Sequence, residues 1–304
     1  MHHVPVLLQE VLRVLGPRQG ETYADCTAGL GGHAAAVGER LGERGTVVLC
    51  DADPGNLAAA ETRVRAIPRG PRVVAIRCNF ADLPRLLSER SIRADMALAD
   101  LGFSSPQVED PARGFSFSRE GPLDMRLDPS LAVSAADLVR SLPEGELARI
   151  IGEYGEEPAA RAIARKLVQE RARRPMNTTT ELAEIVRSVV ARRPGGTDPA
   201  TKTFQALRIA VNDEIGSLGA LLSGVEMAAR SVGRREPTWL GAGARIAVIS
   251  FHSLEDRPVK QAFAAMVREK LGRDISDGAM KAGAEEVASN VRARSATLRA
   301  ISLV

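Results

Sequence analysis

Short apolar segments alternate with helix-like segments in the first third of the chain, and this alternation limits the folds that the chain can adopt. Four such apolar segments span residues 23–27, 46–51, 73–78 and 94–100. Between them lie stretches whose apolar residues recur with the spacing of an α-helix. Apolar strands separated by helices indicate βαβ units, in which parallel strands form a sheet covered by helices. The sequence therefore predicts an α/β fold with a parallel sheet.

The alternation stops after the fourth strand and returns before the C-terminus. Residues 102–130 contain many Gly, Pro and Ser residues and no regular period, which indicates a long ordered loop. Only helical patterns follow this loop until strand-like segments return. We therefore predict a discontinuous α/β domain formed by residues 1–112 and 213–304. An all-helical domain formed by residues 113–212 is inserted into it.

The composition fits a globular protein that works inside the cell. The chain has 304 residues, 44% of them hydrophobic and 26% charged, and a formal net charge of +3. It lacks the run of roughly 18 apolar residues that a membrane span needs, and its start shows no signal-peptide pattern. Three cysteines cannot build a disulfide framework, and no Cys/His spacing predicts a metal site. We expect a cytoplasmic protein with no metal and no membrane contact.

A Gly-rich turn follows the first predicted strand. Gly29, Gly31 and Ala34 match the dinucleotide-binding pattern GxGxxG/A. Asp51 lies about 20 residues further on, where a ribose-binding acid is expected. Glycine lets the backbone approach a ligand closely, so we expect Gly29, Gly31 and Gly32 to contact the ligand. This pattern alone is also typical of an NAD-dependent oxidoreductase.

Asp25 distinguishes between NAD and S-adenosylmethionine as the ligand of this turn. Its carboxylate comes just before the Gly-rich turn, where it would repel the pyrophosphate of NAD. S-adenosylmethionine has no phosphate, and it carries a sulfonium and an ammonium group that a carboxylate attracts. Asp25 therefore favours this methyl donor as the cofactor. Asp51 is then expected to hold the ribose hydroxyls, the alternative being a solvated acid at the end of its strand.

The loop after the fourth strand carries the second group of candidate residues. Asp100 ends the strand, and Ser104, Ser105 and Pro106 follow it. In an open α/β sheet the ligand lies at the carboxyl ends of the strands, so we expect this loop to face the donor methyl group. The Ser-Pro pair resembles the Ser/Asp-Pro-Pro-aromatic loop of methyltransferases that act on exocyclic amino groups of bases. Such an amino group is a poor nucleophile, and acceptors on its N–H bonds would aim its lone pair at the methyl carbon. An ordinary Ser-Pro turn is the alternative.

Several motifs occur together along the chain. They span residues 3–8, 25–33, 100–107, 113–117, 121–126, 203–214, 250–257 and 292–295. On these motifs the chain resembles the bacterial 16S ribosomal RNA cytosine-N4 methyltransferases, the small-subunit methyltransferase H or MraW family, nearly from end to end. The resemblance implies a class I, Rossmann-like methyltransferase fold that uses S-adenosylmethionine. It also implies an inserted helical domain that recognises the substrate, one cytidine in the decoding region of 16S rRNA.

The resemblance also implies roles for individual residues. The donor contacts that it implies are Gly31, Gly32, His33, Asp51, Phe80, Asp100 and Gln107. Taken alone, Phe80 is better explained as a core residue. Among the motif residues we expect Asp124 and Arg126 to contact the substrate. His252 lies just past a strand end, and we expect it to be structural or to orient the substrate rather than to act as a base.

A basic stretch in the predicted helical domain is the candidate RNA contact. Residues 161–174 hold five Arg and one Lys against a single Glu. The predicted phosphate contacts are Arg171, Arg173 and Arg174. A solvated helix face is the alternative. Phe115 and Phe117 either stack on an unpaired base or anchor their loop to the core.

Two other functions fit parts of the sequence. One is an NAD-dependent oxidoreductase that uses the same Gly-rich turn, which Asp25 disfavours. The other is a protein that binds the donor and RNA without turnover, which Asp100 and the loop after it disfavour. The expected partner is 16S rRNA in the small ribosomal subunit, and the sequence leaves open whether the protein is a homodimer.

Overall fold

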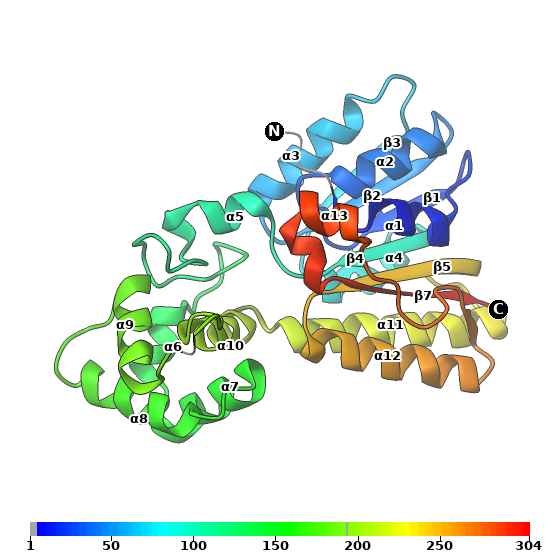
Figure 1. Ribbon diagram of the computed structural model, residues 1–304. Coiled ribbons are helices and arrows are strands. Elements are labelled where there is room, and N and C mark those ends of the chain that lie inside the picture. Colours follow the sequence, from blue (N-terminus) through cyan, green and yellow to red (C-terminus); the bar gives the residue numbers. More distant parts are fainter. Residues whose placement is uncertain (1–4, 193) are drawn as a thin grey trace. The chain divides into compact units, whose positions relative to one another are not determined.

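Two compact units make up the chain. Figure 1 shows the computed structural model, which describes residues 5–192 and 194–304. The α/β unit comprises the chain up to Gly102 and from Ile215 onward, and the helical unit comprises Phe103–Glu214. Residues 103–112 and 213–214, which the sequence predicts to belong to the α/β domain, group with the helical unit. Residues 3 and 4, the start of the first motif, lie outside the described part of the chain.

A seven-stranded sheet in the order β3-β2-β1-β4-β5-β7-β6 forms the α/β unit. The strands are β1 (Thr22–Asp25), β2 (Thr46–Asp51), β3 (Arg72–Arg77), β4 (Ala94–Asp100), β5 (Leu240–Ser250), β6 (Gly272–Asp274) and β7 (Thr297–Leu303). The predicted α/β class and its strands are confirmed, and β1 to β5 are parallel. The prediction of a parallel sheet is wrong for β7, which is antiparallel to both of its neighbours. Residues 275–296 join β6 to the neighbouring strand β7 without crossing to the opposite end of the sheet. β7 therefore runs antiparallel to β6.

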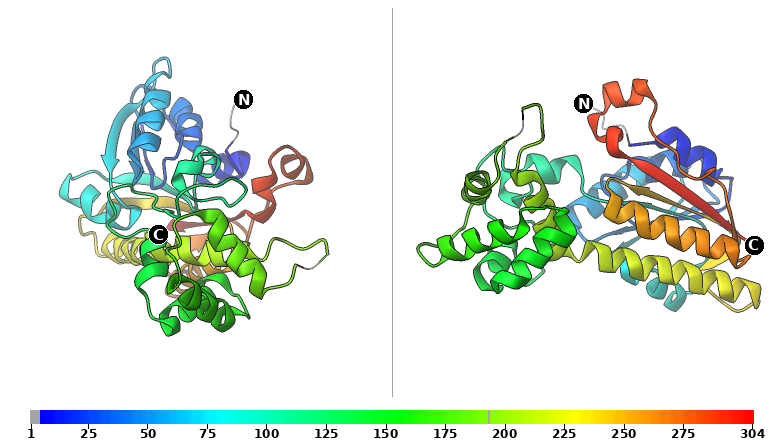
Figure 2. Two further views of the ribbon diagram at one scale, coloured as in Figure 1. Left: turned by 90° about the vertical axis from the view of Figure 1, so that its left-hand side faces the viewer. Right: turned by 60° about the horizontal axis from the view of Figure 1, so that its bottom comes forward.

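Helices cover both faces of the sheet. One face carries α1 (Leu8–Leu15), α2 (Gly32–Leu41) and α3 (Pro54–Arg65), and the other carries α4 (Leu83–Glu89), α11 (Glu214–Gly233) and α12 (Ser253–Arg268). α11 and α12 lie side by side along their face (Figures 1 and 2). In β2, Val47 and Leu49 join one core, whereas Val48 and Cys50 join the other. Both faces are buried, which explains why this strand is a continuous apolar run.

The helical unit has its own apolar core. Its helices are α5 (Ser105–Glu109), α6 (Ala135–Ser141), α7 (Glu144–Gly155), α8 (Ala160–Arg171), α9 (Thr179–Val189) and α10 (Ala200–Asn212). The predicted capping signal at the start of α9 is confirmed. The Glu181 amide donates to the Thr178 hydroxyl at 3.3 Å, and the Thr178 amide donates to the Glu181 carboxylate at 3.1 Å. This reciprocal pair satisfies amides that the first turn of a helix leaves without partners.

The segment near the C-terminus contains two short elements. They are β6 and a helix, α13 (Ala284–Ser289). The Leu7 amide donates to Glu286 in α13 at 2.7 Å, which ties α13 to the start of α1. Within the described residues, no helix combines the length and the apolar character that crossing a membrane requires.

The Thr178 cap predicts a measurable loss of stability. Thr178→Ala removes the side-chain acceptor at the start of α9, and we expect it to lower the free energy of unfolding by about 1 kcal/mol. Urea unfolding followed by circular dichroism would measure this loss. Thr201→Ala, at an exposed position in the first turn of α10, should change the free energy by less than about 0.5 kcal/mol. Equal effects of the two substitutions would contradict the capping role.

Candidate active site

Three carboxyl groups lie at one edge of the sheet. Asp25, Asp51 and Asp100 are the last residues of β1, β2 and β4. These strands are parallel neighbours in the order β2-β1-β4. Because parallel strands end at the same edge, the fold brings together three acids that are far apart in the sequence.

Asp25 is the most deeply buried of the three acids. Its side chain is 1% exposed. The Tyr23 hydroxyl donates to one carboxylate oxygen at 3.0 Å, and the Thr27 amide donates to the other at 3.2 Å. Burial, together with the charge of Asp51, raises the pKa of Asp25 to about 7, although these two hydrogen bonds lower it. A bound cation would favour the ionised form of this carboxyl group.

Asp51 connects β2 to the Gly-rich turn. Its carboxylate accepts hydrogen bonds from the Gly29 amide at 2.8 Å and the Asp53 amide at 2.9 Å. Burial raises the pKa of Asp51 to about 6, although these two hydrogen bonds lower it. The carboxylate is thus fixed by backbone donors, which a freely solvated acid would not be.

The two carboxylate oxygens of Asp100 have different surroundings. Its Oδ2 lies 3.6 Å from His33 Nδ1. Its Oδ1 is buried, and none of the described residues gives it a hydrogen bond. Burial, together with the charges of Asp25 and Glu255, raises the pKa of Asp100 to about 8. A buried acceptor without a partner is costly in free energy, so this oxygen fits a donor group of a ligand.

His33 lies beside Asp100, and its ring is held by a backbone carbonyl group. The imidazole is 6% exposed, and its Nε2 lies 2.9 Å from the Val6 carbonyl oxygen. A carbonyl oxygen only accepts hydrogen bonds, so Nε2 carries the hydrogen and Nδ1 faces the carboxyl group. The resemblance implies a donor contact for His33, which lies beside Asp100 at the start of α2.

The glycines of the turn have packing roles that the sequence analysis did not foresee. Gly31 has φ 74°, and a Cβ atom there would lie 2.7 Å from the Ala60 Cα. A Cβ atom at Gly32 would lie 2.5 Å from the Pro5 Cγ. Glycine is therefore needed for α2 to begin close against α3 and the N-terminal segment. At Gly29 a Cβ atom would lie 3.9 Å from the Thr27 carbonyl oxygen, an ordinary contact, and its φ of 51° is what favours glycine there.

Phe80 and His252 sit at two other strand ends of the same unit. Phe80 opens the 3-10 helix η1 (Phe80–Asp82) after β3, and its half-buried ring packs on the core. His252 Nε2 lies 3.3 Å from the carboxylate of Glu255, which is 3% exposed. The other oxygen of Glu255 accepts from the Phe251 amide at 2.7 Å. Sequence reasoning missed Glu255 as the residue that holds the His252 ring, although it lies in the same motif.

The loop after β4 turns into α5 in the helical unit. Ser104 and Gln107 form a capping box at its start, and the Ser104 amide donates to the Gln107 side-chain oxygen at 2.9 Å. Pro106 lies in the first turn, where proline lacks only an amide that has no partner in the helix. The side chain of Ser105 lies outside the described part of the structure. Gln107 is 4% exposed, and its oxygen serves the helix cap.

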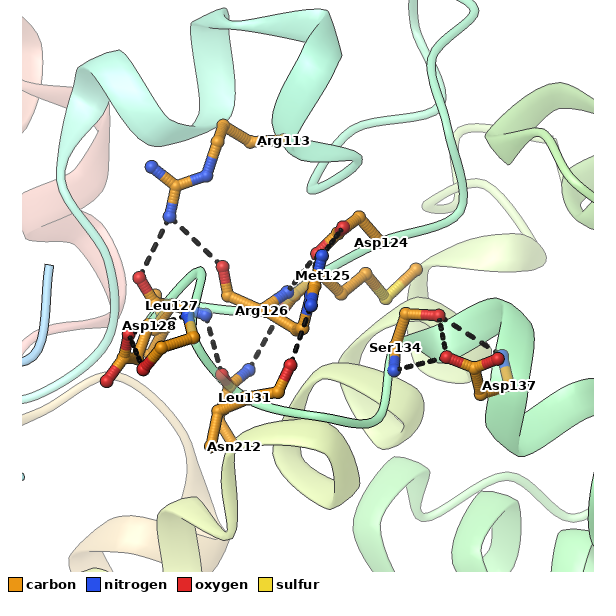
Figure 3. Close-up of polar contacts among 11 residues, drawn as sticks. Arg113, Asp124, Met125, Arg126, Leu127, Asp128, Leu131, Ser134, Asp137 and Asn212 are labelled. Atoms are coloured by element: carbon orange, nitrogen blue, oxygen red, sulfur yellow. Dashed lines mark hydrogen bonds and ion pairs between the residues drawn. The ribbon is translucent and has the colours of Figure 1, made fainter.

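Asp124 and Arg126 build a loop of the helical unit (Figure 3). Two guanidinium nitrogens of Arg126 donate to the two Asp124 oxygens at 2.9 and 2.7 Å, and a third donates to the Leu131 carbonyl at 2.6 Å. Partial burial raises the pKa of Asp124, but the bonds from Arg126 lower it by more. The Asn212 side chain holds the same loop through the Met125 carbonyl at 2.8 Å. The two predicted substrate contacts are therefore used to shape this loop.

The two loop phenylalanines pack within the helical unit. The Phe115 ring stacks on Phe103 with centroids 5.9 Å apart. The Phe117 ring meets Phe204 edge-on at 4.7 Å, and the Arg187 guanidinium lies 5.6 Å above it. Of the two alternatives left by the sequence, this packing supports anchoring of the loop to the core.

Arg171 makes hydrogen bonds within the helical unit. One of its guanidinium nitrogens donates to the carbonyls of Val139 and Leu142, both at 2.6 Å. These carbonyls belong to the C-terminal end of α6, where a cation is favourable. A phosphate contact of Arg171 stays a prediction, because these bonds use only one of its nitrogens. Arg173 and Arg174 are exposed, but they pair with Glu170 at 3.1 Å and Glu181 at 3.3 Å.

The raised carboxyl pKa values predict how stability depends on pH. Asp25 has a higher pKa in the folded chain than in the unfolded chain. Such a carboxyl group makes its full contribution to stability at pH values below its unfolded pKa of 3.8. That stabilisation is lost as pH rises through about 7 for Asp25. Asp25→Asn should therefore gain stability relative to the wild-type protein, by about 1 kcal/mol or more near pH 8 and by much less near pH 5. Calorimetric melting across this range measures the difference.

A matched control isolates the effect of burial in this experiment. Asp277→Asn changes an exposed aspartate with φ 50°, a backbone conformation that asparagine tolerates well. Its stability relative to the wild-type protein should not depend on pH. A similar pH dependence in both variants would contradict a raised pKa at Asp25.

Comparisons with known proteins identify the family. The whole chain, residues 1–304, matches the MraW methylase family. Ribosomal RNA small subunit methyltransferase H of Heliobacterium modesticaldum is 42% identical over 319 aligned positions, which cover 98% of this chain and 97% of the relative. The proteins of that name from Symbiobacterium thermophilum and Halorhodospira halophila are 43% and 44% identical and cover 99% and 98% of this chain and 96% and 93% of their own lengths. The chain therefore belongs to the MraW methylase family and has its Rossmann-like methyltransferase fold.

Proposed function

We propose that this protein transfers a methyl group from S-adenosylmethionine to N4 of the cytidine numbered 1402 in the decoding region of 16S rRNA. The observation that carries the proposal is the cluster of Asp25, Asp51 and Asp100 at the carboxyl edge of the sheet. The relatives support the same substrate class, because each is named a ribosomal RNA small subunit methyltransferase. With this substrate, the protein works in the cytoplasm.

The acidic cluster suits the charge of the donor. S-adenosylmethionine supplies, when bound, a methyl group on a positively charged sulfur. Asp25 and Asp100 would stabilise the cationic groups of the donor, and Asp51 would accept hydrogen bonds from the ribose hydroxyls. Gly29, Gly31, Gly32, His33, Phe80 and Gln107 are the other proposed donor contacts. The charge of Asp51 raises the pKa of Asp25, and the charge of Asp25 raises the pKa of Asp100, so a cation among these acids would relieve their repulsion.

Asp100 is the residue proposed to accept a hydrogen bond from the amino group of the cytosine that is methylated. The lone pair of cytosine N4 is delocalised into the ring, and an acceptor on its N–H bond localises that pair on nitrogen. The buried Oδ1 of Asp100 provides such an acceptor. An ionised Asp100, whose pKa is about 8, would also take up the proton that nitrogen loses after methylation. Ser104, Ser105 and Pro106 follow Asp100 in the chain and are proposed to position the base, and His252 to orient it.

The helical unit is proposed to hold the RNA backbone. A groove of about 760 Å³ between α7 and α8 is lined in part by Arg149, Arg161 and Arg165. Arg161 and Arg165 are exposed, as are Arg173 and Arg174 after α8. Arginine suits phosphate because its guanidinium group donates two parallel hydrogen bonds. These residues and Arg171 are the proposed phosphate contacts.

Nucleoside mass spectrometry tests the reaction directly. We expect 16S rRNA from a strain that lacks this gene to lose N4-methylcytidine, and the purified protein with S-adenosylmethionine to restore it. Restoration should fail with Asp100→Asn, which keeps the size of the side chain but lowers its capacity as an anionic acceptor. A full N4-methylcytidine signal in the deletion strain would exclude the proposed reaction. Donor binding without restoration by the wild-type protein would favour an RNA-binding protein without turnover.

The donor role of Asp51 is tested separately by calorimetric titration with S-adenosylmethionine. Asp51→Ala removes a charged hydrogen-bond acceptor, and such bonds contribute about 1.5–3 kcal/mol. We therefore expect the dissociation constant of the donor to rise at least about tenfold. The control is again Asp277→Asn, which should bind the donor like the wild-type protein. Unchanged affinity in Asp51→Ala would show that this residue does not hold the ribose.

A further inference from the structure

Two cysteines that the proposed reaction does not use meet at the ends of neighbouring strands. Cys50 lies in β2, directly before Asp51, and Cys78 directly follows β3. The strands are paired in parallel, with Cys50 opposite Ile76. The Cys78 amide also donates to the Asp51 carbonyl at 3.3 Å, so the pairing extends past the end of β3. The fold thus brings together two thiols that lie 28 residues apart in the sequence.

The two sulfur atoms are already in contact. Cys50 Sγ lies 3.1 Å from Cys78 Sγ and 3.3 Å from the Cys78 carbonyl oxygen. A disulfide bond is about 2 Å long, so the sulfurs need to approach by only about 1 Å. Cys26, the third cysteine, is buried and 2% exposed. In the part of the chain that the structure describes, no sulfur contact of Cys26 is found.

The environments of the two thiols differ in a way that suits stepwise oxidation. Cys78 is half-buried and Cys50 is fully buried. The hydrogen bond from Cys50 lowers the pKa of the Cys78 thiol, and Arg90 and Arg85 lower it further, against burial and the charge of Asp82. Cys78 is therefore the more accessible and more readily ionised thiol, which are the properties of a cysteine that reacts with an oxidant.

We propose that Cys50 and Cys78 are a modification site, at which a peroxide oxidises the pair to a reversible disulfide. The Cys78 thiolate attacks one oxygen of hydrogen peroxide, the O–O bond breaks, and Cys78 becomes a sulfenic acid as hydroxide leaves. The Cys50 sulfur then attacks the Cys78 sulfur. The S–S bond forms, the S–O bond breaks, and the hydroxyl group leaves as water with the Cys50 proton. Two thiols are thereby oxidised by two electrons, and one peroxide is reduced to two waters.

The disulfide would join the two strand ends beside the donor site. Asp51 follows Cys50 directly, and Phe80 lies two residues after Cys78. Drawing the sulfurs together shifts both residues, so the oxidised protein should bind S-adenosylmethionine about fivefold to tenfold more weakly. This consequence rests on the proposed function, whereas disulfide formation does not. By linkage, a tenfold preference of the donor for the reduced protein raises the reduction potential of the pair by about 30 mV.

Peptide mapping of the peroxide-treated protein tests the site. The full chain is treated with hydrogen peroxide, its remaining thiols are alkylated, and it is digested without reductant. We expect a cross-linked peptide that joins residues 50 and 78, disappears with dithiothreitol, and persists in Cys26→Ser. Cys78→Ser and Cys78→Ala should both abolish it. Oxidation of Cys78 to a sulfinic acid without the cross-link, or a cross-link through Cys26, would overturn the proposal.

Calorimetric titration tests whether the disulfide weakens donor binding. Reduced and oxidised wild-type protein are titrated with S-adenosylmethionine, and Cys78→Ser is titrated before and after peroxide. Weaker binding only by the oxidised wild-type protein supports the coupling, and equal affinities overturn it. Failure of the reduced protein to bind the donor would contradict the proposed function, whereas the mapped cross-link would still establish the disulfide.

Discussion

The gathering of one buried and two partly buried carboxyl groups at one sheet edge is the constraint on which the rest of the site depends. Asp25, Asp51 and Asp100 end three adjacent parallel strands, and burial is the largest cause of the raised pKa at each of them. Burying an acid costs free energy unless the acid is protonated, hydrogen-bonded or paired with a cation. The described residues give hydrogen bonds to Asp25 and Asp51 but none to Oδ1 of Asp100, and a ligand of positive charge would offset the cost of this arrangement.

The turn after β1 organises this edge through its backbone. The Thr27 hydroxyl accepts from the Asp100 amide at 2.7 Å, the Thr27 amide donates to Asp25, and the Gly29 amide donates to Asp51. One short segment thus connects all three strand ends. The positive φ of Gly31 and its contact with Ala60 then set where α2 begins. The same backbone supports His33 next to Asp100, so the Gly-rich turn arranges the acids before any ligand binds.

The helical unit shows why arginine content is a poor guide to RNA contacts. Arg171 binds the carbonyls that end α6, and Arg126 is held by Asp124. Arg208 forms an ion pair with Glu214 at 2.7 Å and lies 4.8 Å from the Phe103 ring centroid. A guanidinium group has five donors, so it satisfies several loop carbonyls or carboxylates at once. Arginines with donors left over after this use are the candidates for phosphate contacts.

The sequence by itself determined the strands other than β6, the capped start of α9 and the edge at which the acids gather. These features depend on local periodicity and on the rule that parallel strands end together. The tertiary structure decided the direction of β7, the use of Arg171 and the contact of Cys50 with Cys78. Each of these depends on partners distant in the sequence, such as Val139 for Arg171. Residue types and spacing do not specify which distant groups meet, because packing of the whole core selects among many compatible pairings.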